Sequence, residues 1–380
     1  MSPISREFQI FVKPVGAECN LRCTYCYYLA KKNLYPGHKQ LLMSDEILEN
    51  YIIQHIEAST EPIISFSWHG GEPLLAGIDF FRKIVAHQHK HQPEGQAIVN
   101  SIQTNGTLLN ETWCNFLATE KFNVGISIDG PEELHNLHRR ADDHSAVFRK
   151  VLRGYNLLQK SRIQAEILCV VNYGNVKYPL EIYNFFKEQG ARFITFLPLV
   201  EKLPRSVRGV TRQSVPSGDF GIFLCKVFDE WVEKDIGEIK IQIFEEAART
   251  AFNQEHTLCI FKENCGGVPV VEHNGDFYPC DHYVDVAHLS GNIMKGSLVD
   301  FLDSESQQAF GRAKSCLLPR YCLECEVKPM CNGECPKNRF ISTPDGDQGL
   351  NYLCSGYKLF FNHCHPFIKA ISAAWKSQKS

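Results

Sequence analysis

Three cysteines near the start of the chain have the spacing of a metal or cluster site. Cys19, Cys23 and Cys26 lie within eight residues, and thiolates this close together on a loop indicate ligation of a metal or a cluster. Three thiolates would leave one iron of a four-iron cluster open to a ligand from outside the protein. The alternative is a zinc ion completed by a histidine, for which His38 is the nearest candidate.

A second group of cysteines lies in the last third of the chain. Its eight thiolates would suffice to ligate two four-iron clusters completely. A zinc ribbon from Cys322 to Cys335 is the alternative, since tetrahedral sulfur sites suit zinc as well as iron. The other five cysteines stand apart, and we interpret them as small core residues. The eight are Cys259, Cys265, Cys280, Cys322, Cys325, Cys331, Cys335 and Cys354, and the five are Cys114, Cys169, Cys225, Cys316 and Cys364.

Polar residues that follow strand-like segments could bind a small charged ligand. Gly70 and Gly71 allow a close backbone approach, and Glu72 can accept a hydrogen bond from an ammonium group. Arg139 is the best candidate for bidentate pairing with a carboxylate, although Arg140 could exchange roles with it. For each of these residues an ordinary turn is the alternative interpretation. Two further candidates, which could reach a ribose or a carboxylate, are Ser127 and Asn172.

Alternating sequence patterns predict the elements that position these residues. Six strands that alternate with five helices predict a parallel α/β sheet with right-handed crossovers. Chemistry then gathers at the C-terminal ends of the strands, and the first cysteine group directly follows the first strand. Periodicity does not distinguish an open sheet from a partial barrel. The predicted strands are 8–12, 64–68, 97–103, 124–128, 165–171 and 193–197, and the helices are 44–56, 80–89, 111–119, 145–160 and 176–189.

The rest of the chain has a different character. The sequence pattern of residues 201–254 predicts a connector, followed by an amphipathic helix over 220–232. From about residue 255 the regular periodicity fades, while Cys, Gly and Pro punctuate the sequence. We therefore expect residues 255–380 to depend on bound metal more than on a large core.

A short histidine run ends one of the predicted helices. His87, His89 and His91 alternate with other residues. They could bind adventitious metal, but the pattern favours a solvated helix end.

Composition excludes several classes of function. The net charge of −3 provides no basic field for a nucleic-acid backbone. No apolar run approaches the ~18–20 residues of a membrane span, and residues 1–11 contain no hydrophobic signal-peptide region. Disulfides explain sixteen cysteines poorly, because the cytosol keeps thiols reduced. We therefore expect a cytoplasmic protein with neither nucleic acid nor membrane as a partner.

The first cysteine group, with Tyr25 before its last cysteine and in a loop after a strand, resembles the signature of the radical S-adenosylmethionine (SAM) superfamily. The resemblance implies a [4Fe–4S] cluster on this group, with SAM at the open iron. It also implies a partial (β/α)6 barrel, similar to a TIM barrel, over residues 1–200. Gly70, Gly71 and Glu72 would clamp the methionyl amino group of SAM, and Arg139 its carboxylate.

The C-terminal cysteine pattern resembles the SPASM domain, which is found on radical SAM enzymes that modify peptides and proteins. This resemblance implies a Cys-rich SPASM domain over residues 255–380 and a total of three [4Fe–4S] clusters. It also implies a ligand assignment that spacing alone does not give. Cys259, Cys265, Cys280 and Cys335 would hold one auxiliary cluster, and Cys322, Cys325, Cys331 and Cys354 the other.

The run from Cys259 to Asp281 is similar to the anaerobic sulfatase-maturating enzymes. This similarity implies oxidation of a cysteine or serine of an unfolded sulfatase to Cα-formylglycine under anaerobic conditions. A 5′-deoxyadenosyl radical would remove a hydrogen atom from the β-carbon, Asp281 would accept the substrate proton, and an auxiliary cluster would accept the remaining electron. A small electron-transfer protein, flavodoxin or ferredoxin, would reduce the first cluster. An ordinary surface aspartate is the alternative for Asp281.

Two positions depart from the family pattern, and two other functions compete. Family members often carry Asp at the position of Asn136 and Gln at that of Thr195, both expected at the edge of the substrate pocket. One competing function is a SPASM-type radical SAM enzyme that modifies another ribosomally made peptide or protein. The other is a zinc-dependent binding module that uses its cysteines structurally.

Overall fold

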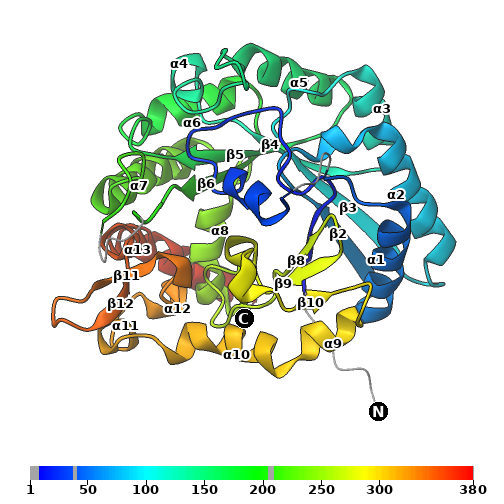
Figure 1. Cartoon of the computed structure of the whole chain (residues 1–380). Coiled ribbons are helices and arrows are strands. Elements are labelled where there is room, and N and C mark those ends of the chain that lie inside the picture. Colours follow the sequence, from blue (N-terminus) through cyan, green and yellow to red (C-terminus); the bar gives the residue numbers. More distant parts are fainter. Residues whose placement is uncertain (1–7, 37–40, 204–208, 380) are drawn as a thin grey trace. The chain divides into compact units, whose positions relative to one another are not determined.

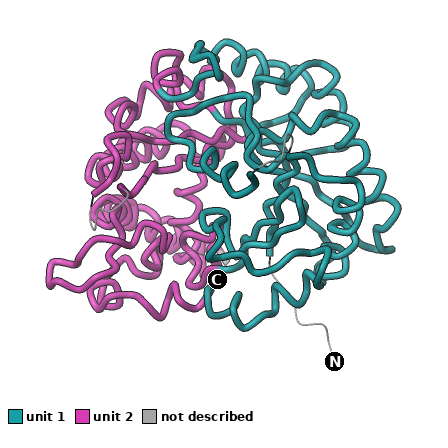
Figure 2. Tube along the Cα trace, in the orientation of Figure 1, with its two compact units in different colours: residues 1–127, 138–165, 266–311 teal, residues 128–137, 166–265, 312–380 magenta. Residues whose placement is uncertain are grey.

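The chain folds into two compact units, each assembled from three separate segments (Figure 2). The computed structural model describes residues 8–36, 41–203 and 209–379, so His38 lies outside the described residues. Unit 1 contains residues 1–127, 138–165 and 266–311, and unit 2 contains residues 128–137, 166–265 and 312–380. The domain boundaries predicted after residues 200 and 254 follow the sequence motifs, whereas the two units are defined by contacts within the fold. These boundaries stay a prediction.

Unit 1 is built on a mostly parallel sheet in the strand order β10-β9-β8-β1-β2-β3-β4 (Figure 1). β1 pairs in parallel with both β2 and β8, and β2, β3 and β4 continue in parallel, whereas β9 is antiparallel to β8 and β10. β1 is short because Pro14, which follows it, has no N–H to donate to the ladder. The strands are β1 (Phe11–Lys13), β2 (Ile63–Trp68), β3 (Ala97–Thr104), β4 (Asn123–Ser127), β8 (Val270–Glu272), β9 (Asp276–Tyr278) and β10 (Gly291–Asn292).

The helices of unit 1 follow from local sequence. α1 begins after Ser44, whose Oγ accepts a hydrogen bond from Ile47 N at 3.2 Å and so caps the helix, as predicted. α1 and α2 pack against each other on the same side of β2 and β3 (Figure 1). The helices are α1 (Asp45–Ala58), α2 (Ile78–His91), α3 (Glu111–Thr119), α5 (Phe148–Lys160) and α9 (Leu298–Asp303), with 3-10 turns η1 (Leu29–Leu34), η2 (Pro73–Ala76), η4 (Asp281–Tyr283) and η5 (Val286–His288).

Unit 2 combines a parallel β5-β6-β7 segment with a helical layer. α13 packs along α7, where Gly221 and Gly356 allow the backbones to touch: a Cβ on Gly356 would lie 2.1 Å from Ser217 O. The ring of Phe220 meets that of Tyr357 edge to face, with centroids 5.7 Å apart. The strands are β5 (Glu166–Val171), β6 (Phe193–Pro198), β7 (Lys240–Ile241), β11 (Arg339–Ser342) and β12 (Gln348–Asn351). The helices and turns are α4 (Glu132–His135), α6 (Pro179–Glu188), α7 (Ser217–Lys234), α8 (Gln242–Arg249), η3 (Thr250–Phe252), α11 (Arg320–Leu323), α12 (Lys328–Cys331), η6 (Pro336–Asn338) and α13 (Cys354–Lys379), while α10 (Glu305–Cys316) has residues in both units.

The sequence patterns located the N-terminal elements and misjudged the C-terminal part. All six predicted strands, the five helices and the amphipathic helix now labelled α7 are confirmed, with ends that shift by a few residues. Regular structure after residue 255 is more extensive than the fading periodicity indicates, because β8 joins the sheet beside β1 and α13 runs for 26 residues. α13 buries Tyr357, Phe360 and Phe361 and packs along α7, so this region shares an apolar core with that helix.

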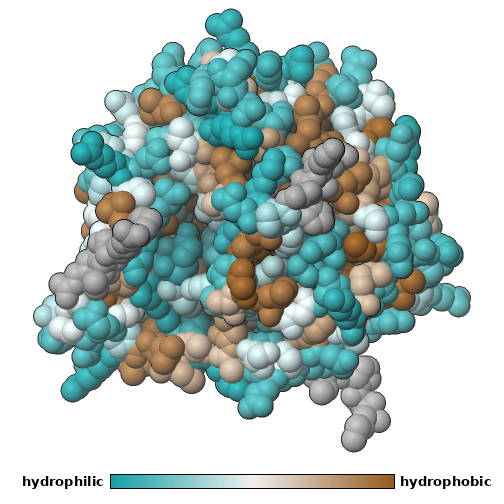
Figure 3. Space-filling view, in the orientation of Figure 1, coloured by the Kyte–Doolittle hydropathy of each residue, from teal (hydrophilic) through white to brown (hydrophobic). Residues whose placement is uncertain are grey.

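Figure 3 shows hydrophobic residues among hydrophilic ones on the face that it draws. α13, the longest of the described helices, carries lysines and histidines between its apolar residues. Within the ranges that the structure describes, no helix combines the length and the apolar character that a membrane crossing requires.

Candidate active site and cluster-binding residues

The loop that carries the first cysteine group is held against the loop after β2. Gly71 N donates a hydrogen bond to Gly16 O, and Glu72 N donates one to Glu18 O, both at 2.8 Å. A Cβ on Gly71 would lie 2.0 Å from Glu18 O, and Gly70 has a φ of +143° that favours glycine. The sequence predicts a close backbone approach at these glycines, and the structure identifies the cysteine loop as one partner.

Arg139 and Tyr25, two of the predicted SAM contacts, lie next to each other. The Arg139 Cζ is 5.5 Å from the centre of the Tyr25 ring, in a cation–π contact, and only 7% of Arg139 is exposed. Arg140 instead donates from Nη1 to His144 O at 3.2 Å. This geometry favours Arg139 over Arg140 as the buried guanidinium beside the cysteine loop.

Glu72 is fully buried and tied to the end of β3. Its Oε1 accepts hydrogen bonds from Leu74 N at 3.1 Å and Thr104 Oγ1 at 2.7 Å, and its Oε2 accepts one from Asn105 N at 2.7 Å. A carboxylate has about four acceptor positions, so Oε2 keeps one for an ammonium group. Burial raises the pKa of Glu72 to about 7, although the three hydrogen bonds act to lower it.

Ser127 and Asn172, the remaining predicted contacts, each have a local partner. Ser127 Oγ accepts a hydrogen bond from Gln103 Nε2 at 3.2 Å within unit 1. In unit 2 the buried Asn172 accepts from Gly174 N at 2.8 Å and donates to Val170 O at 3.2 Å, which stabilises the turn after β5. Their contact with SAM stays a prediction.

The two positions that depart from the family pattern also have local roles in unit 2. Thr195 is buried in β6, and its hydroxyl contacts Gln242 Oε1 at 2.7 Å and the Glu166 carboxylate. Asn136 is the C-cap of α4. Their expected place at the edge of the substrate pocket stays a prediction.

Asp281, the predicted base, lies beside the first cysteine group. Its Oδ1 is 2.6 Å from Lys13 Nζ, and its Oδ2 accepts a hydrogen bond from the hydroxyl of Tyr27, the residue after the last cysteine of that group. The side chains of Lys13 and Asp281 are only 3% and 14% exposed. Burial alone would raise the pKa of Asp281, but the Lys13 charge and the hydrogen bonds from Lys13 and Tyr27 hold it well below its usual range.

Sequence reasoning missed Lys13 and Tyr27. Lys13 is the last residue of β1, and its ammonium also lies 4.3 Å from the centre of the Tyr28 ring. A lysine at the C-terminal end of a buried strand is the signal that could have found it, because sites of parallel sheets gather there. The partner of Lys13 lies more than 260 residues away in the sequence, and no local pattern reveals that contact.

Two cations of unit 2, the buried Lys314 and the half-buried Arg339, hold the loops that carry C-terminal cysteines. Lys314 Nζ donates to the backbone carbonyls of Cys259 at 2.9 Å and Ile260 at 2.8 Å. Arg339 donates to the carbonyls of Gly333 at 2.8 Å and Glu334 at 3.0 Å. Positive charge beside clustered thiolates offsets part of their repulsion.

Four cysteines of unit 2 line a single cavity. Three come from the loops and short helices around α11 and α12, and the fourth begins α13. Burial, together with the neighbouring thiols of this group, raises the pKa of Cys354 to about 11, so these thiols need a metal to become thiolates at neutral pH. The four are Cys322, Cys325, Cys331 and Cys354, which is the set that the resemblance assigns to one cluster.

The thiols of the two cysteine groups are not as close together as the ligands of a single ion. Sulfur atoms around a tetrahedral zinc, at about 2.3 Å from the metal, lie about 3.8 Å apart. Among the described residues, the one group of three or more ligand atoms that all lie within 4.8 Å of one another is Glu49, His87 and His91. Neither the first cysteine group nor the four cavity cysteines are drawn together as one zinc ion would require.

The five isolated cysteines behave differently from one another. Three of them are fully buried, which confirms their interpretation as core residues, and one is partly exposed. The interpretation is wrong for Cys316, which lies exposed at the end of α10. The buried three are Cys114, Cys169 and Cys364, and the partly exposed one is Cys225.

Known proteins resemble this chain along its whole length. Residues 14–185 match the radical SAM superfamily, and residues 259–326 match an iron–sulfur cluster-binding domain, SPASM. The chain is 42% identical to a serine-type anaerobic sulfatase-maturating enzyme of Bacteroides thetaiotaomicron, over 100% of this chain and 94% of that protein. It is 34% identical to a cysteine-type anaerobic sulfatase-maturating enzyme of Clostridium perfringens, over 96% and 97%. A solved structure of native anSMEcpe with bound AdoMet and Cp18Cys peptide covers 96% of this chain and 99% of its own, with 33% identity and a TM-score of 0.87.

The chain belongs to the anaerobic sulfatase-maturating enzymes. Its membership confirms the predicted α/β fold, with a partial (β/α)6 barrel and a C-terminal SPASM domain. It also confirms the predicted radical SAM enzyme with SAM and [4Fe–4S] clusters as cofactors. A zinc-dependent binding module is therefore not the function of this enzyme.

Gly71→Ala is expected to cost the enzyme its N-terminal cluster. The added methyl group would lie 2.0 Å from Glu18 O and push the cysteine loop away. We expect a loss of about four iron atoms per chain, measured by iron and sulfide analysis. Gly218→Ala is the control, because no atom lies within 4 Å of the added Cβ. Equal iron in the two variants would contradict this account.

SAM binding is expected to strengthen as the pH rises toward 7. The raised pKa of Glu72 means that its carboxyl group is protonated below pH 7 in the absence of SAM, and only the ionised form attracts the ammonium of SAM. The affinity should fall by up to about tenfold per pH unit below 7. Calorimetric titration with SAM between pH 5.5 and 7 measures this slope. Glu72→Gln should flatten it, and an unchanged slope would show that another group titrates.

Proposed function

We propose that this enzyme oxidises a cysteine or serine of an unfolded sulfatase to Cα-formylglycine. When bound, SAM and the clusters supply the 5′-deoxyadenosyl radical that removes a hydrogen atom from the β-carbon, and a path for the remaining electron. The observation that carries the proposal is the contact of Asp281 with Tyr27 and Lys13, beside the first cysteine group. It supports a proton acceptor next to the place where the radical would form.

Asp281 is the proposed acceptor of the substrate's hydroxyl or thiol proton. Its lowered pKa keeps the carboxylate ionised at neutral pH and therefore ready to accept. A carboxylate of low pKa is a weak base. The substrate's hydroxyl or thiol group, however, becomes much more acidic while the carbon that carries it is oxidised to the aldehyde level. Lys13 and Tyr27 fix one oxygen each, so the carboxylate does not rotate during the reaction.

Eleven cysteines are proposed to hold three [4Fe–4S] clusters. Cys19, Cys23 and Cys26 would leave one iron open for SAM. One of the two auxiliary sets, Cys322, Cys325, Cys331 and Cys354, is supported by the single cavity that its four thiols line. In the other auxiliary set, burial and the neighbouring Cys265 thiol raise the pKa of Cys259 to about 11. The auxiliary sets are Cys259, Cys265, Cys280 and Cys335, and Cys322, Cys325, Cys331 and Cys354.

SAM is proposed to bind across the loops that meet at the first cysteine group. Arg139 would pair with its carboxylate, and the free acceptor position of Glu72, together with the backbone at Gly70 and Gly71, would take its ammonium group. The support is the burial of both charged side chains beside that loop. The other proposed contacts are Tyr25, Ser127 and Asn172.

The proposed setting is an anaerobic cytoplasm with an electron donor. The first cluster needs one electron for each radical, so a small electron-transfer protein, flavodoxin or ferredoxin, is the proposed reductant.

A matched pair of peptides tests the function. Reduced, cluster-loaded enzyme is incubated with SAM and a sulfatase-derived peptide that carries serine or, in the second peptide, cysteine at the same position. We expect the serine peptide to lose the mass of two hydrogen atoms and the cysteine peptide to exchange its thiol for an aldehyde oxygen. No mass change in either peptide, with 5′-deoxyadenosine still formed, would refute sulfatase maturation. That outcome would favour the alternative, modification of another ribosomally made peptide or protein.

A further inference from the structure

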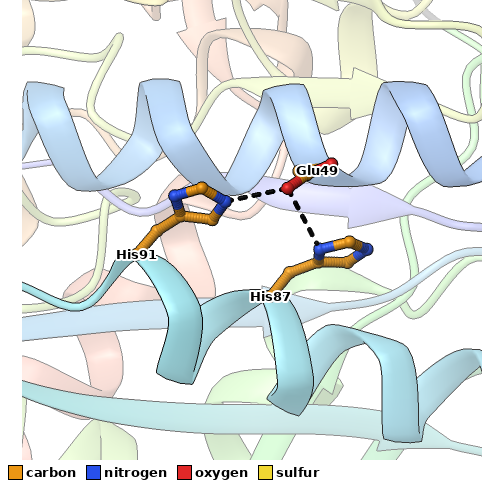
Figure 4. A group of neighbouring side chains, drawn as sticks. All are labelled: Glu49, His87 and His91. Carbon is orange, nitrogen blue, oxygen red and sulfur yellow. Dashed lines mark hydrogen bonds and ion pairs between the residues drawn. The ribbon is translucent and has the colours of Figure 1, made fainter.

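Two histidines of α2 and a glutamate of α1 meet at one point (Figure 4). His87 and His91 are four residues apart, which places them on the same face of the helix, and Glu49 approaches them from the neighbouring helix. The side chains of His87 and His91 are only 16% and 24% exposed, whereas His89 between them is exposed. The prediction of a solvated helix end therefore holds for His89, whereas His87 and His91 are half-buried.

The distances match the ligand set of a small cation. His91 Nε2 is 2.9 Å and His87 Nδ1 is 3.5 Å from the same oxygen, Glu49 Oε1. Nitrogen and oxygen ligands about 2.0–2.1 Å from a tetrahedral zinc lie about 3.3 Å apart, and the two distances bracket that value. Lys90 Nζ also lies 2.8 Å from this oxygen. Three groups thus converge on one oxygen that offers two lone pairs.

A second carboxylate orients one of the histidines. His87 Nε2 is 3.3 Å from Asp45 Oδ1, in the first turn of α1, so its other nitrogen, Nδ1, faces Glu49. A carboxylate behind a histidine is the usual support of a metal-bound imidazole, because it fixes the tautomer and the ring orientation. This contact points to a ligand site rather than to a chance meeting of side chains.

We propose that Glu49, His87 and His91 bind one zinc ion, with water at the fourth position. Two imidazoles and one carboxylate form a ligand set that zinc accepts, with one position open. Lys90 would release Glu49 on binding; its side chain is 64% exposed and free to turn to solvent. The ion would join α1 to α2, the helices that flank β2 and β3, and it takes no part in the proposed oxidation.

Zinc binding by the cluster-loaded enzyme tests this site. Each protein is dialysed against a zinc buffer, and its zinc and iron contents are then measured together. We expect one zinc per chain in the wild type and in the control His89→Ala, and none in the double variant His87→Ala/His91→Ala. Asp45→Asn should keep the ligands and weaken binding roughly 10–100-fold. Zinc should raise the unfolding temperature of the wild type and leave that of the double variant unchanged.

Two outcomes would overturn the proposal. One is a wild type that takes up no zinc, in which case the group is an ion-pair network only. The other is equal zinc in the wild type and the double variant, which would assign the metal to cysteines or to other surface groups. Iron measured in the same samples shows whether zinc has replaced a cluster, so a failure here is separate from any failure of the proposed function.

Discussion

Asp281→Asn is expected to abolish formylglycine formation while 5′-deoxyadenosine is still produced from SAM. Asparagine has the same shape and can still contact Tyr27, but its amide cannot take the substrate proton. Loss of a general base costs typically 10²–10⁴-fold in rate. Mass spectrometry of the peptide and chromatography of 5′-deoxyadenosine, run on the same reactions, separate the two steps. Iron content is measured in parallel, because Cys280 is the preceding residue.

Asp285→Asn is the matched control for this experiment. Asp285 lies four residues further along, where it caps η5, and its side chain is 42% exposed. We expect this variant to keep full activity. Full formylglycine formation by the Asp281 variant, at equal iron content, would remove Asp281 as the base and leave its contact with Lys13 as a structural ion pair.

The parts of the fold that sequence predicts well are those with local causes. α1 is an example, because Ser44 caps it and its apolar side chains recur at helical spacing. β8 and β9 were missed because Pro269, Gly275 and Pro279 interrupt the pattern around these three-residue strands. Whether β8 would lie beside β1 depends on pairing between distant segments, which periodicity does not encode. α13 was missed for a different reason: Pro366 lies inside it, and a proline is a signal against a continuous helix.

The residues of the site also differ in how well the sequence alone can identify them. The first cysteine group and Arg139 could be proposed from the sequence because their proposed ligands demand particular residue types near a strand end. Lys13 and Tyr27 could not be proposed in this way, because their contacts with Asp281 join segments that are far apart in the sequence. His87 and His91 were predicted at a solvated helix end, and the sequence does not reveal that α1 brings Glu49 against them. Each of these residues was overlooked because its partner lies far from it in the sequence and meets it only in the folded chain.

Cys354→Ala is expected to remove one auxiliary cluster and with it the formation of formylglycine. Cys354 begins α13 and lines the cavity together with three other cysteines, so its loss would leave one iron of the proposed auxiliary cluster with neither a thiolate nor SAM to hold it. The iron content should fall from about twelve to about eight atoms per chain. Iron and sulfide analysis of anaerobically purified protein measures the change, and the absorbance of the clusters should fall in proportion.

Cys364→Ala supplies the comparison from the same helix. Cys364 is fully buried, and its thiol donates to Phe361 O at 3.5 Å, as a structural cysteine does. Its replacement should leave the iron content unchanged and lower only the stability of the α7–α13 packing. Equal iron in the two variants would show that the cavity group does not hold a cluster through Cys354. Loss of iron from the Cys364 variant alone would reverse the assignment of the two residues.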